Sequence, residues 1–155
     1  MRIYFLRHGL AEDRSPKKPD AERVLTKEGI RKIELSVKKF AALDIHPSAI
    51  YTSPLVRAYQ TAEIVAKNLK CPLYSRELLA PGFDPDKLQK LLEDFTEDEL
   101  MVVGHEPDFS YTVSKVIGGG SIIMKKGGLA RVDFQTKSLL KGSLVWLLTP
   151  RLLTS

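Results

Sequence analysis

Two histidines and two arginines each stand at, or one helical turn beyond, the end of a short apolar segment of the kind that forms a buried strand. The set comprises Arg7, His8, Arg57 and His105. Guanidinium groups bind phosphate oxygens through paired N–H donors. A neutral imidazole can act as a nucleophile. The chemistry that these residue types fit is therefore the binding and transfer of a phosphoryl group.

Glycines adjoin both histidines, which favours a binding site over simple packing. Gly9 follows His8 and Gly104 precedes His105, and a glycine lets a ligand approach the backbone closely. Taken singly, each histidine would more often be structural and Arg57 an ordinary solvated charge. The combination favours a functional site, whereas the third histidine, His46, has no partner motif and receives no role.

The neighbouring cations should keep the nucleophile neutral. Positive charge on Arg7 and Arg57 disfavours the imidazolium form and should lower the pKa of His8. The chain has no Walker-type glycine loop and no obvious acidic metal cluster, and its three histidines and one cysteine show no zinc-binding spacing. We therefore expect a metal-independent site with no cofactor.

The elements that position these residues follow from hydrophobic periodicity and capping signals. The predicted strands are residues 2–6, 49–52, 72–74, 101–103, 129–134 and 143–149. The predicted helices are residues 26–41, 53–69, 84–95 and 108–117, with N-caps at Thr26, Ser53, Asp84 and Asp108. Alternation of strands and helices predicts a three-layer α/β sandwich over residues 1–155, with a mainly parallel six-stranded sheet, at least one reversed strand and an antiparallel pair at its end. Ligands of such sheets bind at the carboxyl ends of the strands.

Composition narrows the remaining classes of protein. The 155 residues carry 24 Lys plus Arg against 19 Asp plus Glu, a net charge of +5, but the charges are mixed along the chain and few aromatic residues accompany the basic ones. This pattern argues against nucleic acid as a partner. The apolar runs are too short for a signal peptide or a membrane span. Because Cys71 is alone, no internal disulfide can form, and we expect a cytoplasmic protein without membrane contact.

Four motifs carry a resemblance to a known family. In chain order they are Leu6-Arg7-His8-Gly9, Leu25-Thr26-x-x-Gly29, Ser53-Pro54-Leu55-x-Arg57-Ala58-x-Gln60-Thr61-Ala62 and Val103-Gly104-His105-x-Pro107. The sequence resembles the histidine phosphatase superfamily over nearly its whole length, and within it the SixA-type phosphohistidine phosphatases. The resemblance implies a phosphoglycerate-mutase-like fold without a large lid. It also implies a covalent phosphohistidine on His8, phosphoryl oxygens held by Arg7, Arg57 and His105, and hydrolysis by water.

The proton donor is the least defined part of the predicted site. Mutase-like relatives place a glutamate after the third strand, and the nearest candidate here is Glu77, although its neighbours do not match the mutase motif. Glu77 is equally compatible with an ordinary solvated loop. An imidazole leaving group is far less basic than an alkoxide, so an enzyme acting on phosphohistidine depends less on a proton donor.

Three hypotheses about function remain open on the sequence alone. The first is a phosphatase of protein-borne phosphohistidine, with a histidine-phosphotransfer protein as one form of substrate. The second is the same chemistry on a small phosphoester such as a sugar or nucleotide phosphate, and the third is a non-catalytic module that binds phosphate or phosphoproteins. The short segment 76–100 leaves no room for a large lid and favours the first. Basic residues of the 9–25 loop, namely Arg14, Lys17 and Lys18, could attract an acidic partner or simply be solvated.

Overall fold

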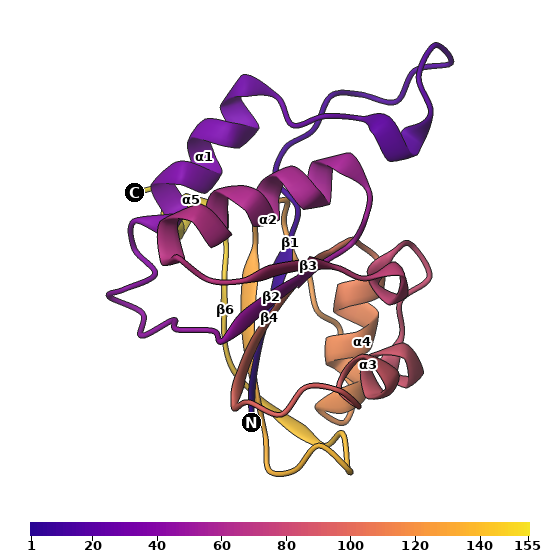
Figure 1. Cartoon of the computed structure of the whole chain (residues 1–155), viewed down its shortest axis with the longest axis vertical. Coiled ribbons are helices and arrows are strands. Elements are labelled where there is room, and N and C mark those ends of the chain that lie inside the picture. Colours follow the sequence, from indigo (N-terminus) through magenta and orange to yellow (C-terminus); the bar gives the residue numbers. More distant parts are fainter.

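A six-stranded sheet forms the middle layer of the structure, a computed structural model that describes residues 1–155 (Figure 1). Its strands are β1 (Arg2–Arg7), β2 (Ala49–Thr52), β3 (Leu73–Ser75), β4 (Glu99–Gly104), β5 (Leu129–Phe134) and β6 (Gly142–Leu148). They lie in the order β3-β2-β4-β1-β5-β6. The first four strands run parallel, and β5 is antiparallel to both of its neighbours. The predicted parallel sheet with a reversed strand and a final antiparallel pair is confirmed.

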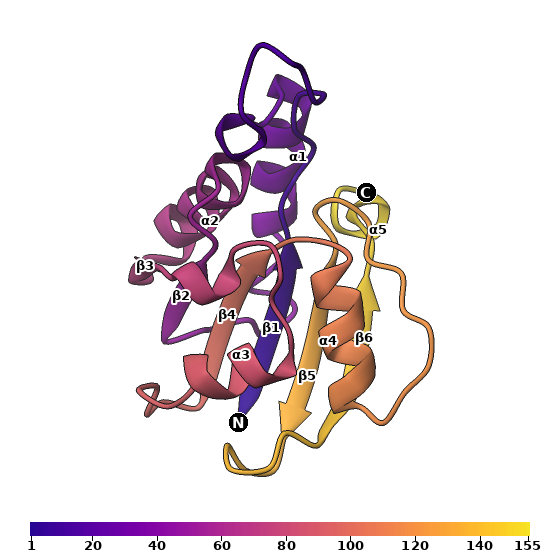
Figure 2. The ribbon, with the colours of Figure 1, turned by 90° about the vertical axis from the view of Figure 1, so that its right-hand side faces the viewer.

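Helices cover both faces of the sheet, which confirms the three-layer prediction (Figure 2). One face carries α1 (Lys27–Val37), α2 (Val56–Leu69) and the short α5 (Pro150–Leu153), and the other carries α3 (Pro85–Leu91) and α4 (Asp108–Val116). Side chains of β1 alternate between the two apolar clusters: Phe5 packs with α4, and Leu6 belongs to the cluster of α1 and α2. This alternation follows from the two-residue repeat of a strand. The longest helix, α2, has 14 residues, and no helix combines the length and hydrophobicity that crossing a membrane requires.

Two of the four predicted helix caps are confirmed and two are wrong. The Thr26 hydroxyl accepts a hydrogen bond from Gly29 N at 2.9 Å, and Asp84 Oδ1 accepts one from Lys87 N at 2.8 Å. Ser53 does not cap α2, which begins three residues later at Val56. The Ser53 hydroxyl instead accepts a hydrogen bond from Leu55 N, in the turn before the helix. Asp108 lies inside the first turn of α4, and its carboxylate bonds to another loop rather than to its own helix.

Short elements were not anticipated from the pattern. The 3₁₀ turns η1 (Asp20–Glu22) and η2 (Glu77–Leu79) interrupt segments predicted as loops. The first predicted helix ends at Val37 and continues only as turns. Three-residue turns carry too few residues for a periodic signal.

Candidate active site

Parallel pairing of β1 and β4 brings the two predicted histidines together. The register sets Arg7 opposite Gly104, and His8 N donates to Gly104 O at 3.0 Å. The ring centroids of His8 and His105 therefore lie 5.4 Å apart. The histidines are adjacent because neighbouring parallel strands end at the same edge of the sheet.

Helix α2 completes the cluster by adding Arg57. Thr61 Oγ1 accepts a hydrogen bond from Gly9 N at 3.1 Å and donates to Arg57 O at 2.8 Å, so the helix is tied to the turn after β1. The Arg57 side chain then reaches His8, where its Nε donates to His8 Nε2 at 3.3 Å. Both His8 and Arg57 are buried.

The ring of His8 is held in one tautomer, with an unprotonated Nε2 whose lone pair accepts the hydrogen bond from Arg57 Nε. Its Nδ1 lies 2.7 Å from Gly9 O, and since a carbonyl only accepts hydrogen bonds, Nδ1 carries the proton. Burial lowers the pKa of His8 to about 3, with smaller contributions from the charges of His105, Arg57 and Arg7. The expected direction is thus found, but the main cause is loss of hydration rather than the arginines. Nε2 is the nitrogen available to attack a phosphorus atom.

His105 is oriented by the serine that was predicted to cap a helix. Its Nε2 lies 2.7 Å from Ser53 Oγ, while its buried Nδ1 has no partner. Burial lowers the pKa of His105 to about 4, with a smaller contribution from Arg57, so the ring is neutral at physiological pH. When the Ser53 hydroxyl donates to Nε2, the proton of His105 resides on Nδ1 and is available to a ligand oxygen.

Arg7 is positioned by the segment that precedes β5. Its Nη1 donates to Met124 O at 2.8 Å, and Gly127 N contacts both Arg7 O and His8 O at 3.1 and 2.9 Å. Gly127 has a φ of +79°, a backbone angle that residues other than glycine rarely adopt. A segment far along the chain thus fixes the end of β1.

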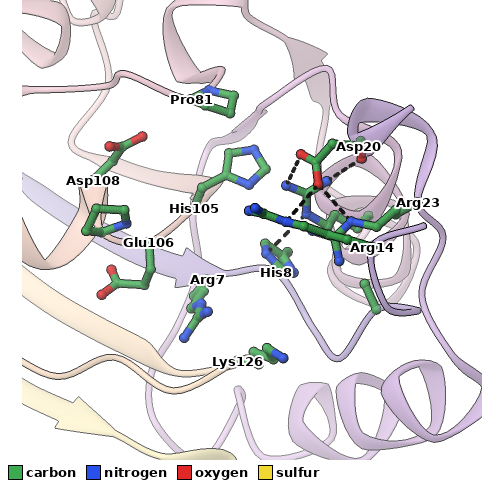
Figure 3. A pocket seen from close by; sticks show the side chains of 13 residues that line it. Arg7, His8, Arg14, Asp20, Arg23, Pro81, His105, Glu106, Asp108 and Lys126 are labelled. Carbon is green, nitrogen blue, oxygen red and sulfur yellow. Dashed lines mark hydrogen bonds and ion pairs between the residues drawn. The ribbon is translucent and has the colours of Figure 1, made fainter. Parts of the chain in front are cut away.

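A cavity of about 440 Å³ opens above this cluster and is lined by charged groups (Figure 3). Besides Arg7, His8, Arg57 and His105, its charged lining residues are Arg14, Asp20, Arg23, Glu106, Asp108 and Lys126. Only one lining residue is hydrophobic. Several cations and two neutral imidazoles around one polar cavity suit a phosphoryl dianion. No group of three or more metal-binding side chains gathers in the structure.

Asp20 links the cavity wall to the cluster, a contact that the sequence did not reveal. Its carboxylate accepts from Arg23 Nε at 2.8 Å and pairs with Arg57 Nη2 at 3.2 Å, and its backbone oxygen accepts from Arg57 Nη1 at 2.8 Å. Burial alone would raise the pKa of Asp20, but the hydrogen bond from Arg23 and the charges of Arg57 and Arg23 lower it overall. Asp20 and Arg57 are separated by 37 positions in the sequence, so no local signal predicts the pair.

Some predicted residues do not join the cavity. Glu77 is exposed at the start of η2 and is not among the residues that line the cavity. Of the three basic loop residues, Arg14 lines the cavity, while Lys17 and Lys18 do not, and Lys18 pairs with Glu12 at 2.6 Å. The carboxylates that do reach the cavity come from η1, from the turn after β4 and from the first turn of α4.

The fold and the site define a family. The sequence profile of the histidine phosphatase superfamily (branch 1) matches residues 3–80, and the chain belongs to this superfamily. A curated but uncharacterized relative from Picosynechococcus sp. is 33% identical over 164 residues, covering 96% of this chain and 99% of the relative.

Within the superfamily the chain is of the SixA type. The solved structure of the protein histidine phosphatase SixA complexed with tungstate is 25% identical, covers 99% of both chains and superposes with a TM-score of 0.85. The alpha-ribazole phosphatase from Shigella flexneri shares the fold at 16% identity, with a TM-score of 0.75 over 97% of both chains. Family membership supports phosphatase activity and leaves the substrate to be argued from the site.

Proposed function

We propose that the protein is a metal-independent phosphohydrolase that forms a covalent phosphohistidine on His8 and acts on phosphohistidine carried by another protein. The observation that carries the proposal is the buried His8 ring, whose Nδ1 is bonded to Gly9 O and whose Nε2 lone pair faces Arg57. A neutral imidazole fixed in this tautomer needs no further deprotonation before it attacks.

In the first step, His8 Nε2 attacks the phosphorus atom as the bond to the leaving group breaks. Before this attack, Arg57 Nε turns from the lone pair to a phosphoryl oxygen and so releases the lone pair. Arg7 and the Nδ1 proton of His105 bind the other phosphoryl oxygens. These fixed donors stabilise the charge that develops on the oxygens. In the second step, water attacks the phosphorus of phosphorylated His8 and releases inorganic phosphate.

The surroundings of the cavity favour a protein-borne substrate. From the segment between β3 and α3, only Pro81 lines the cavity, so no large insertion covers the entrance. Phosphohistidine on a protein surface requires such an open approach. The lack of Glu77 in the cavity is also compatible with an imidazole leaving group, which departs without a strong proton donor.

The test compares the wild-type protein with His8→Ala in the presence of a chelator. We expect hydrolysis of a phosphohistidine protein by the wild type, no turnover by His8→Ala, and phosphate on His8 in mass spectra after an acid-free quench. Turnover by His8→Ala at the wild-type rate would overturn the mechanism. Efficient hydrolysis of sugar or nucleotide phosphates alone would replace the proposed substrate with a small phosphoester, and binding without turnover of any substrate would indicate a phosphate-binding module.

A further inference from the structure

The three carboxylates that line the cavity differ in how fully their oxygens are used. Asp20 is paired with Arg23 and Arg57. Both oxygens of Glu106 accept hydrogen bonds from Ser110, one from its backbone N–H and one from its hydroxyl. Asp108 accepts a single hydrogen bond and forms no ion pair.

The single contact of Asp108 fixes its carboxylate at the cavity and leaves one oxygen free. Oδ2 accepts from Gly82 N at 2.8 Å, which joins the start of α4 to the loop after η2, and Oδ1 has no partner within the protein. Gly82 directly follows Pro81, which also lines the cavity. Asp108 therefore brings a negative charge and an open hydrogen-bond acceptor to this wall.

Figure 3 shows that this wall lies across His105 from the arginine-rich side. Asp20, Arg14 and Arg23 stand on one side of the histidines, whereas Asp108 stands on the other. The phosphoryl oxygens belong with the cations near His8. A leaving group that carries an N–H would be stabilised on the side that offers a carboxylate.

We propose that Asp108 selects substrates in which phosphorus is bonded to an imidazole nitrogen, by accepting a hydrogen bond from the N–H of that leaving ring. This inference rests on the proposed function, because it assigns the substrate preference of the same site. A protonated phosphoimidazole carries positive charge on its ring, and a nearby carboxylate favours that charged form. Hydrogen bonds to an ionised group are also stronger than neutral ones.

The transfer step balances without a proton donor. The P–N bond to the substrate ring breaks as the bond from His8 Nε2 to phosphorus forms. The electron pair of the broken bond stays on the departing ring nitrogen, and the other ring nitrogen keeps its proton. The leaving group therefore departs as neutral imidazole, with its N–H still bonded to Asp108 Oδ1.

A phosphoester gains nothing from the same carboxylate. Negative charge develops on the departing oxygen, which an ionised Asp108 can neither protonate nor attract. The residue should thus raise the preference for P–N over P–O substrates rather than the rate with every substrate.

The experiment compares Asp108→Asn with the wild type on N-phosphoimidazole and on 4-nitrophenyl phosphate. Asparagine keeps one side-chain oxygen to accept from Gly82 N, so the contact with the loop is retained. It replaces the free carboxylate oxygen with an amide NH2 group, which carries no charge and cannot accept a hydrogen bond. Asp86→Asn makes the same change at an exposed position of α3 outside the cavity and serves as the control. Both substrates are also tested with His8→Ala.

We expect Asp108→Asn to lower kcat/KM for N-phosphoimidazole about tenfold and to leave the value for 4-nitrophenyl phosphate nearly unchanged. The basic limb of the kcat–pH profile for N-phosphoimidazole should also move to lower pH, by about one unit, because the bound ring loses the charge that favours its protonation. A purely structural role of Asp108 would lower both activities together and leave the pH profile in place.

The outcomes separate this inference from the proposed function. His8-dependent turnover with an unchanged substrate ratio in Asp108→Asn overturns the role of Asp108 and leaves the phosphatase mechanism standing. Turnover that does not depend on His8 overturns the mechanism, and the assignment of Asp108 falls with it.

Discussion

The floor of the cavity and its rim are built in different ways. The floor, defined here as Arg7, His8, Arg57 and His105, includes three side chains that are 4–6% exposed and is fixed by strand register and hydrogen bonds to backbone groups. The rim, defined as Arg14 and Lys126, consists of exposed residues, and the side chain of Arg14 is 83% exposed. Water and salt screen buried charges such as that of Arg57 much less than exposed ones. Substitutions in the floor should therefore change the chemistry, and substitutions in the rim should change mainly encounter.

Arg57→Lys, a substitution in the floor, should lower activity far more than any substitution in the rim. The guanidinium of Arg57 contacts His8 Nε2 and two oxygens of Asp20 at once, which the compact ammonium of lysine cannot do. We expect kcat/KM for a phosphohistidine substrate to fall about a thousandfold. Steady-state kinetics together with a circular dichroism spectrum measure this, and a loss smaller than about tenfold would show that charge alone is sufficient in the floor.

Acidification should destabilise the folded protein through the two buried histidines of the floor. The pKa values of His8 and His105 are lowered from 6.5 to about 3 and about 4, so between about pH 6.5 and about 4 the unfolded chain binds protons that the folded chain does not. The free energy of unfolding should therefore fall as the pH falls, by up to about 1.4 kcal/mol per pH unit for each histidine.

Urea unfolding across this pH window measures the effect, with the double variant His8→Gln/His105→Gln as the reference for all other groups. Glutamine does not titrate, so the pH dependence of the variant should be shallower than that of the wild type. Parallel curves for the two proteins would contradict the pKa values of the buried rings.

Gly29→Ala should show that the junction between the 9–25 loop and α1 is as tightly packed as the floor. A Cβ at this position would lie 2.1 Å from Leu10 O, the oxygen that accepts a hydrogen bond from Thr26 N at 3.0 Å. The backbone must shift to relieve this overlap, and we expect a loss of about 2 kcal/mol in the free energy of unfolding. Lys27→Ala, an exposed change in the same helical turn, is the control and should alter stability by less than about 0.5 kcal/mol. Equal stabilities for the two variants would mean that the backbone at this junction moves freely enough to accommodate the added Cβ.

The floor could be predicted from the sequence because its residues stand in fixed relation to strand ends. Arg7 is the last residue of β1, His8 follows it directly and His105 follows β4 directly, so the parallel sheet alone brings them together. Ser53 was misread because its position before Pro54 fits a helix cap, and only the pairing of Thr52 with Val103 shows that it faces His105. That pairing joins strands far apart in the sequence, so the residues near Ser53 do not predict it.

The carboxylates around the cavity could not be predicted in the same way. Asp20 meets Arg57, and Asp108 meets Gly82, through loops whose course depends on packing. Glu77 was chosen for its place after the third strand, yet η2 leaves it exposed and outside the cavity. A residue's position in the sequence predicts its place in the site only where helices and strands fix the geometry between that residue and the rest of the site.

Arg14→Ala should give the smallest effect and should define the limit of the rim. The side chain of Arg14 pairs with Asp20 at 3.4 Å but is mostly exposed, so water weakens its attraction for a substrate phosphate. We expect kcat/KM for a phosphohistidine protein to fall about threefold at low salt, and the difference from the wild type to vanish as ionic strength rises. Lys17→Ala removes an exposed charge of the same loop that does not line the cavity, and it should leave kcat/KM unchanged.

Because steering acts on association, kcat itself should stay constant in Arg14→Ala. A fall in kcat that persists at high salt would place Arg14 in contact with the transferring phosphoryl group. Arg14 would then belong to the floor and not to the rim.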